Sequence, residues 1–341
     1  MTAMALFFLV LFNNYIIINY FFVPTFYEKI GSSFFYLYLF MFVISLILFF
    51  ILPKRNANLL RMVRKNKFAK WLVTIYLVLS SSYLILITSL SLGYNFYQNY
   101  SPLIFILALI MAVILIMRFR IEKIVNSALI FFLILFVMII YTLACDLVLI
   151  DFSEIKLIGF NKEMFLGLPL MLILILDNYI LALIRLKEEK SSFKVIVLAN
   201  MFLFFFASVE GLMLVLFFGD TLRGFKGIGY LLYNLNPTFF VLENFDFLYI
   251  YSLTLSALFK VLVSFKLIES CHIEKKTFGK FFLITSTLAL SLLTYFFGVY
   301  LFQYQVYFLY LLLFILVIYF ITLWRIACDK HQRNNRSIKN E

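Results

Sequence analysis

The chain has 341 residues, of which 65% are hydrophobic and only 13% are charged, and its net charge is +12. This composition leaves no segment for a soluble catalytic domain, which argues against an enzyme and places the function in or across a membrane. The basic residues are spread along the chain without a nucleic-acid-binding motif, so no nucleic-acid partner is expected. The cysteines and histidines show no metal-site or disulfide spacing, and no cofactor is expected.

Apolar runs of about the length that a spanning helix needs, roughly 20 residues, fill almost the whole chain. Because lipid forces backbone groups to pair internally, each run is predicted to be a transmembrane helix. The ten predicted helices cover residues 4–24, 33–53, 71–95, 102–118, 125–148, 164–186, 195–219, 246–268, 281–302 and 305–326. The expected fold class is therefore an all-α integral membrane protein with about ten transmembrane helices.

Lysine and arginine are concentrated in alternate connections between these runs. They are frequent in 54–70, 118–123, 185–194 and 266–280, and in the tail from residue 325. Since basic connections stay in the cytoplasm, this alternation predicts a multi-pass bacterial membrane protein with both termini cytoplasmic. The first run lacks a basic start and a small-residue cleavage site, so a retained helix is expected rather than a signal peptide.

Ten helices divide into two halves of five, residues 1–150 and residues 151–341, the second ending in a short cytoplasmic tail. An odd number of helices in each half gives the halves opposite orientations, as in inverted-repeat transporters with a mid-membrane site between interrupted helices. The first helix of each half is predicted to be interrupted by polar or helix-breaking residues, namely Asn13 and Asn14, and Gly167, Pro169, Asp177 and Asn178. The asparagines either line a ligand site or bridge neighbouring helices by hydrogen bonds.

Three of the charged side chains within the predicted spans stand out: Asp177, Glu210 and Lys260. Such a charge is costly at mid-bilayer unless it is paired or hydrated. At about 1.5 Å per residue, Asp177 and Lys260 lie at the same depth, roughly 20 Å from the outer ends of their helices, so they are expected to pair. The pair either fastens two helices together or borders a ligand cavity in which Asp177 meets an amino group, unless Lys260 extends toward the cytoplasm. Glu210 is shallower and is a candidate protonatable or ligand-facing carboxylate.

Hydroxyl groups add candidate ligand contacts. Ser256 lies one turn before Lys260 on the same helical face, and Ser81 belongs to a serine cluster in the third span. Most such hydroxyls are expected to bond their own backbone or a neighbouring helix. Glu243 and Asp246 are predicted to form an outer gate, and the alternative is that they are solvated acids at the start of a helix.

Two local patterns point to a known family. The segment Leu242–Asp246 (LENFD) is followed by Phe259-Lys260, and Arg120–Ile124 (RIEKI) forms a short basic turn. In these patterns and in helix number the chain resembles the spore-germination permease family, the B subunits of nutrient germinant receptors, in the amino acid–polyamine–organocation superfamily. That family has an acidic cluster at the outer start of the eighth helix and a lysine deep within it. Asn244 stands where the family usually has arginine.

The resemblance implies a 5+5 inverted-repeat (LeuT-like) fold with a central site between its first, third, sixth and eighth helices. It implies a subunit of the spore inner membrane that binds a small nutrient, often an amino acid. Ligand binding would shift its conformation and signal to a larger membrane subunit and a lipoprotein. The alternative is a proton- or sodium-coupled amino acid transporter. A third hypothesis is a membrane glycan polymerase, for which the longest outward loop offers Arg223, Glu243 and Asp246.

Overall fold

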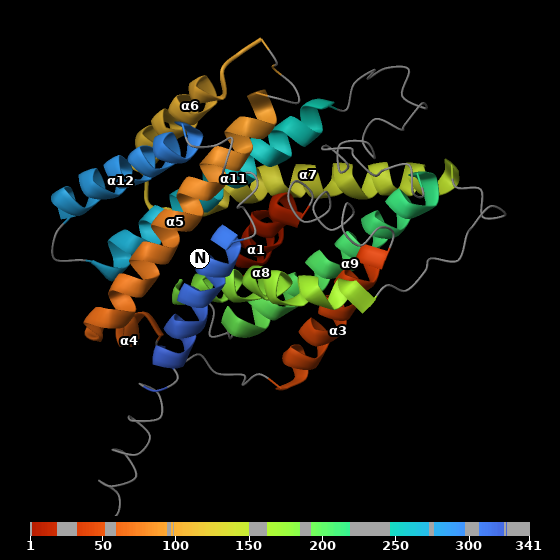
Figure 1. Cartoon of the computed structure of the whole chain (residues 1–341), viewed down its shortest axis with the longest axis horizontal. Helices are drawn as coiled ribbons and strands as arrows, with labels where there is room; N and C mark the ends of the chain where they lie inside the picture. Colours follow the sequence, from red (N-terminus) through yellow and green to blue (C-terminus); the bar gives the residue numbers. More distant parts are fainter. Residues whose placement is uncertain are drawn as a thin grey trace, which may run out of the picture.

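The computed structural model describes residues 2–18, 33–51, 59–93, 97, 99–149, 162–184, 192–218, 246–272, 276–296, 307–323 and 325. All regular structure in these residues is helical (Figure 1). The helices are α1 (Ala3–Ile17), α3 (Phe34–Ile51), α4 (Leu59–Lys65), α5 (Lys67–Ser91), α6 (Pro102–Ile116), α7 (Ile121–Leu149), α8 (Leu168–Ile180), α9 (Ser192–Phe218), α11 (Asp246–Cys271), α12 (Lys276–Phe296) and an unlabelled helix Tyr307–Leu323. Short 3-10 helices, η5 (Lys162–Gly167) and η6 (Leu181–Leu183), flank α8.

Three stretches among the described residues are long and apolar enough to cross a membrane. They are Lys67–Ser91 in α5, Ser192–Leu216 in α9 and Ile250–Cys271 in α11. The all-helical fold and these stretches indicate a membrane-associated protein. Large apolar side chains also point outward, as on α7, where Ile130 and Val137 are more than 60% exposed. Surface of this kind is stable against lipid but not against water.

Local sequence signals explain where several helices begin. The side chain of Thr2 accepts a hydrogen bond from the Ala5 N–H at the start of α1. Asn66 has an extended backbone and accepts from the Ala69 N–H, so it ends α4 and begins α5. These side chains satisfy N–H groups that have no partner in the first helical turn. Helix α4 lies within a segment that the sequence predicted to be a connection, and this is a correction to that prediction.

The two helices with polar interruptions behave differently. Helix α1 continues without a break through Asn13 and Asn14, so the interruption predicted there is wrong for the described part of α1. The Asn14 side chain bonds a neighbouring helix instead of its own backbone, which leaves the helical ladder intact. The α8 segment is interrupted, since the chain changes from 3-10 to α-helix after Gly167. Pro169 occupies the first turn of α8, where its missing N–H has no cost.

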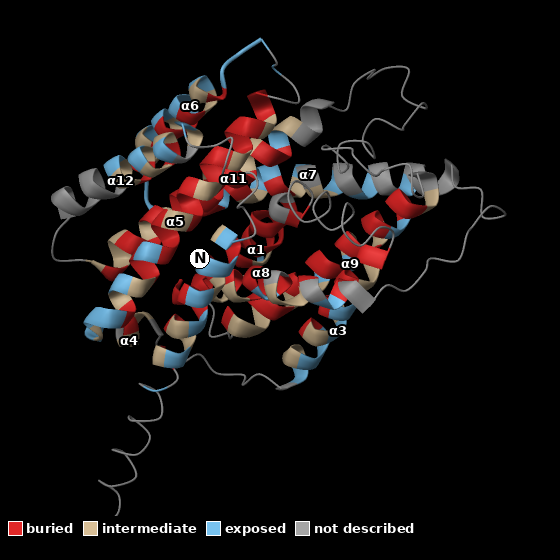
Figure 2. Ribbon diagram, viewed as in Figure 1, coloured by how far each residue is buried: buried red, intermediate tan, exposed pale blue. Residues whose placement is uncertain are grey.

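Helix α1 lies at the centre of the described helices and packs against α7, α9 and α11 (Figure 1). Helix α5 packs along α11 and α12, and α3 packs along α9. Residues of α1, α5, α8 and α11 that face these contacts are buried, whereas α6 and α7 expose much of their surface (Figure 2). The packing therefore brings the polar residues of α1, α5, α8 and α11 into one interior region.

Candidate functional site

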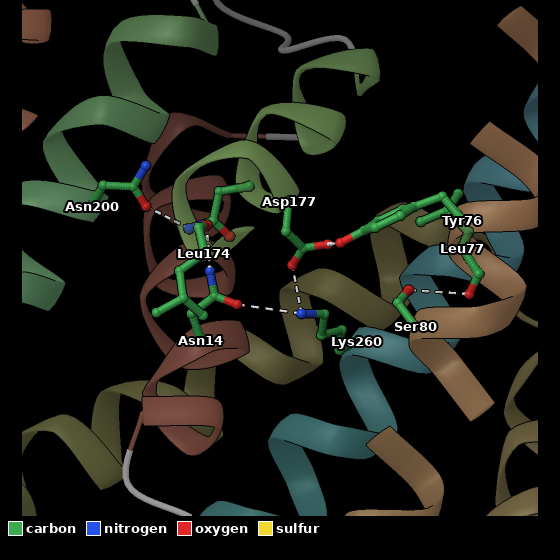
Figure 3. Close-up of polar contacts among 9 residues, drawn as sticks. Asn14, Tyr76, Leu77, Ser80, Leu174, Asp177, Asn200 and Lys260 are labelled. Atoms are coloured by element: carbon green, nitrogen blue, oxygen red, sulfur yellow. Dashed lines mark hydrogen bonds and ion pairs between the residues drawn. The ribbon is translucent and has the colours of Figure 1, made fainter. Parts of the chain in front are cut away.

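A buried ion pair joins α8 to α11. The Lys260 ammonium lies 2.5 Å from Asp177 Oδ2, and the two side chains are only 7% and 8% exposed. The other carboxylate oxygen, Oδ1, accepts a hydrogen bond of 2.7 Å from the Tyr76 hydroxyl of α5 (Figure 3). The pair expected from matching depth is thus present, and Lys260 does not extend away from it. Each charge has an opposite charge in contact, which offsets much of the cost of burial.

Asn14 connects the ion pair to the backbone of α8. Its side-chain oxygen accepts a hydrogen bond of 3.3 Å from Lys260 Nζ, and its Nδ2 donates one of 2.8 Å to the Leu174 carbonyl (Figure 3). That carbonyl lies within the first two turns of α8, and Leu174 is three residues before Asp177. One amide therefore fixes the lysine on one side and α8 on the other, so a movement of α8 relative to α11 must break at least one of these bonds.

A second amide contact continues the network to α9. Asn178 Nδ2 donates a hydrogen bond of 2.5 Å to Asn200 Oδ1, and both side chains are buried. Because Asn178 follows Asp177, α8 presents a charged group to α11 and an amide to α9. The polar network thus connects side chains of α1, α5, α8, α9 and α11.

The helices that form this network also carry polar atoms with unused hydrogen-bonding capacity within the described part of the chain. They belong to buried side chains and have no hydrogen-bond partner there: Asn13 Oδ1, Ser81 Oγ, Asn178 Oδ1 and Ser256 Oγ. A buried polar group without a partner costs about 1–3 kcal/mol, so native structures keep few of them. All four atoms belong to residues that the sequence predicted to bind a ligand.

The two serines lie on the same side of the ion pair. Helices α5 and α11 are antiparallel, because Thr74 near the start of α5 contacts His272 just after α11. Ser81 follows Tyr76 by five residues, and Ser256 precedes Lys260 by four. At about 1.5 Å per residue, both hydroxyls are about one helical turn from the ion pair in the same direction. Many other hydroxyls bond their own helix as expected, for example Ser82 to the Val78 carbonyl.

Glu210 forms a separate polar contact. Its Oε1 accepts a short hydrogen bond from the Tyr15 hydroxyl, which joins α9 to α1, and its side chain is buried. The next residue, Gly211, lies against Phe34 of α3. Tyr15 follows Asn14 directly, so α1 connects the Glu210 contact to the Asp177–Lys260 network.

The remaining predicted site residues fall, wholly or in their side chains, outside what the structure describes. Glu243 and the loop that contains Arg223 lie outside the described residues, and Asp246 is the first residue of α11, with its side chain also outside them. A cavity of about 130 Å³ lies elsewhere, bordered by Leu60 of α4, Glu122 of α7 and residues of α11. No group of histidine, cysteine and carboxylate side chains in the described residues could hold a metal ion.

Sequence reasoning missed Tyr76, Asn200 and Tyr15. Asn200 carried a usable signal, because it is an isolated amide in an otherwise apolar run. The tyrosines carried none, since the chain has 22 of them and most positions suit a tyrosine at a membrane interface or in a core.

No model of a known protein family matches this sequence, and no curated protein matches it either.

Proposed function

We propose that this chain is a multi-pass membrane subunit that binds a small zwitterionic nutrient, such as an amino acid, at the Asp177–Lys260 pair. It then signals by a change of conformation, as the sensing subunit of a spore germinant receptor. The proposed topology has ten spans in two inverted halves of five, with both termini in the cytoplasm. The observation that carries the proposal is a buried ion pair between α8 and α11, helices that also carry the buried atoms Asn178 Oδ1 and Ser256 Oγ, which have no hydrogen-bond partner within the described residues.

The chemistry of the pair suits a ligand that carries both charges. A ligand ammonium group can replace Lys260 Nζ on Asp177, while the ligand carboxylate accepts hydrogen bonds from Lys260. Two ion pairs then replace one, and no unpaired charge remains buried. The hydroxyls of Ser81 and Ser256 and the amide oxygen of Asn13 supply further acceptors or donors. A ligand with only one of the two charges would leave Asp177 or Lys260 without a partner.

Insertion of a ligand between Asp177 and Lys260 would separate α8 from α11. The bonds of Asn14 to Lys260 and to Leu174 would then no longer coexist in their present geometry. The ligand therefore has different affinities for the closed and the separated arrangement, which is the requirement for shifting the population between them. A larger membrane subunit and a lipoprotein that contact the moving helices would receive the signal.

The test is a thermal-shift screen of the purified chain against amino acids, nucleosides and sugars. A zwitterion should raise the unfolding midpoint of the wild type by mass action but should not raise that of Asp177→Asn. Lys266→Gln is the matched control, because it removes a lysine of α11 that pairs with Glu269 outside the network, and it should keep the response. An equal response of Asp177→Asn and the wild type would refute the site. If no compound shifts the wild type, the screen is repeated with co-expressed partner subunits.

The second candidate is a proton- or sodium-coupled amino acid carrier that uses the same site. It is favoured by Glu210, a buried carboxylate that is separate from the ion pair and suited to proton binding. Counterflow of a labelled ligand in proteoliposomes distinguishes the two functions, because a carrier exchanges the ligand and a receptor only binds it. Glycan polymerisation is the third candidate, and loss of glycan elongation in Arg223→Ala would support it.

A further inference from the structure

The junction of α4 and α5 carries a dense group of cations. Between Leu59 and Ser91 the chain has five basic residues and no acidic one: Arg61, Arg64, Lys65, Lys67 and Lys70. Asn66 turns the chain between the two helices, so the last turn of α4 and the first turn of α5 lie next to each other. We call residues 64–71 the α4–α5 elbow. Within the described part of the chain, no carboxylate pairs with Lys65 or Lys67.

The elbow has one buried and one exposed side. Val63 and Ala69 are fully buried and hold it against the helical core. Lys65 and Lys67 are exposed, and the neighbouring Trp71 is 54% exposed. A tryptophan beside lysines at the end of a spanning helix is typical of the level at which lipid headgroups meet the acyl chains. The exposed side therefore combines positive charge with an aromatic ring at that level.

We propose that the α4–α5 elbow binds the headgroups of anionic lipids. Its occupant must carry negative charge, because no carboxylate of the described residues pairs with exposed Lys65 or Lys67, and it must belong to the bilayer, because exposed Trp71 lies on an apolar surface of α5 that continues at Ile75. Groups of four or more lysines and arginines next to a spanning helix are typical of such binding. This inference does not depend on the ligand of the Asp177–Lys260 pair.

The elbow also contacts the end of α11. Arg64 Nε donates a hydrogen bond of 2.8 Å to the Ser270 carbonyl, and the Trp71 ring lies 6.0 Å from the ring of His272. Figure 1 shows α4 beside the same end of α5 and α11. A headgroup on the elbow therefore stabilises the segment that holds the end of the helix carrying Lys260.

The experiment uses Trp71 as its reporter. The sequence has two tryptophans, so Trp324→Phe leaves Trp71 as the single fluorophore. The full chain is reconstituted into phosphatidylcholine vesicles that contain a fixed fraction of brominated phosphatidylglycerol or of brominated phosphatidylcholine. Brominated lipids quench a tryptophan that they contact, so the ratio of the two quenching curves gives the local preference for the anionic lipid.

We expect phosphatidylglycerol to quench Trp71 more strongly than phosphatidylcholine. Lys65→Gln and Lys67→Gln should each lower this preference about fivefold, the contribution of one basic residue at a membrane surface. The matched control is Lys194→Gln, which removes a lysine from the first turn of α9 that lies over the Phe49 ring. The control should leave the preference unchanged.

Three results would overturn the proposal. Equal quenching by the two lipids would mean that the elbow has no anionic partner in the bilayer. An equal loss in Lys194→Gln and Lys67→Gln would assign the effect to net charge. Displacement by inorganic phosphate, but not by chloride at the same ionic strength, would assign the surface to a free anion. If Trp324→Phe does not fold, retention of phosphatidylglycerol by the wild type and the lysine variants in native mass spectrometry gives the same comparison.

Discussion

Removing one partner of the Asp177–Lys260 pair should destabilise the folded protein far more than removing both partners. Among the described residues, the buried carboxylate in Lys260→Met keeps the Tyr76 hydroxyl as its one partner, and the buried ammonium in Asp177→Asn keeps amide oxygens. Removing one partner of a buried pair costs about 3–5 kcal/mol. Because each remaining charge keeps a hydrogen bond, we expect each single variant to lose about 3 kcal/mol, the lower end of that range.

The double variant Asp177→Asn/Lys260→Met leaves no buried charge. Its cost should therefore be about 1 kcal/mol, the value of an ordinary hydrogen bond. The two single losses together are about 6 kcal/mol against about 1 kcal/mol for the double variant, so the coupling free energy should be about 5 kcal/mol. The free energy of unfolding is measured by titration of mixed micelles with sodium dodecyl sulfate, for the wild type and the three variants.

A second cycle on Lys266 and Glu269 supplies the control. This pair is on the same helix and has a distance of 3.0 Å, but its side chains are more exposed. Its coupling should stay below about 1 kcal/mol, as is usual for pairs in contact with solvent. Additive losses at Asp177 and Lys260, with coupling below about 0.5 kcal/mol, would refute the reasoning, because they would mean that the two charges do not depend on each other.

Two other features lead to measurable outcomes. Burial, followed by the charge of Lys70, lowers the pKa of His272, whose ring contacts the Thr74 hydroxyl at 2.8 Å. A histidine with a lowered folded pKa binds its proton more readily when unfolded, so stability should fall as pH drops below about 6.5, the ordinary histidine value. This fall in the thermal midpoint should be absent in His272→Gln, and an identical pH profile would contradict the assignment. Gly211→Ala would place a methyl group 3.2 Å from the Phe34 ring. It should destabilise the protein by about 1–2 kcal/mol in the same micelle titration, and an unchanged value would contradict close packing of α3 on α9.

Residue pattern and depth were sufficient to predict the ion pair. A charge within a span must find a partner at its own depth, and only Lys260 matched Asp177 in this respect. Apolar composition and length likewise predicted a helix in each of the ten apolar runs, and within the described residues each run contains one. These features were predictable because the membrane restricts both backbone and charge more strongly than water does.

Other features depend on how helices face one another, which a single sequence does not specify. Tyr76 contacts Asp177 only because α5 packs against α11 in one particular rotation. Helix α4 was missed because its basic residues are typical of a connection, whereas Val63, which is fully buried, fixes it as a helix against the core. The continuous α1 was missed because asparagine is a poor helix former unless its side chain finds a partner on another helix, as Asn14 does.

The free-energy cost of burying Asp177 and Lys260 also bears on function. A buried ion pair can often be replaced by uncharged residues with little loss of stability, so stability alone does not explain the presence of Asp177 and Lys260. The buried hydroxyls of Ser81 on α5 and Ser256 on α11, which have no partner in the described part of the chain, add a further cost. A ligand-binding role accounts for both costs. The variant Asp177→Asn/Lys260→Met should therefore be folded and nearly as stable as the wild type, yet give no thermal shift with any zwitterion. A double variant that still responds would separate the ion pair from ligand binding and leave it as a fastener between α8 and α11.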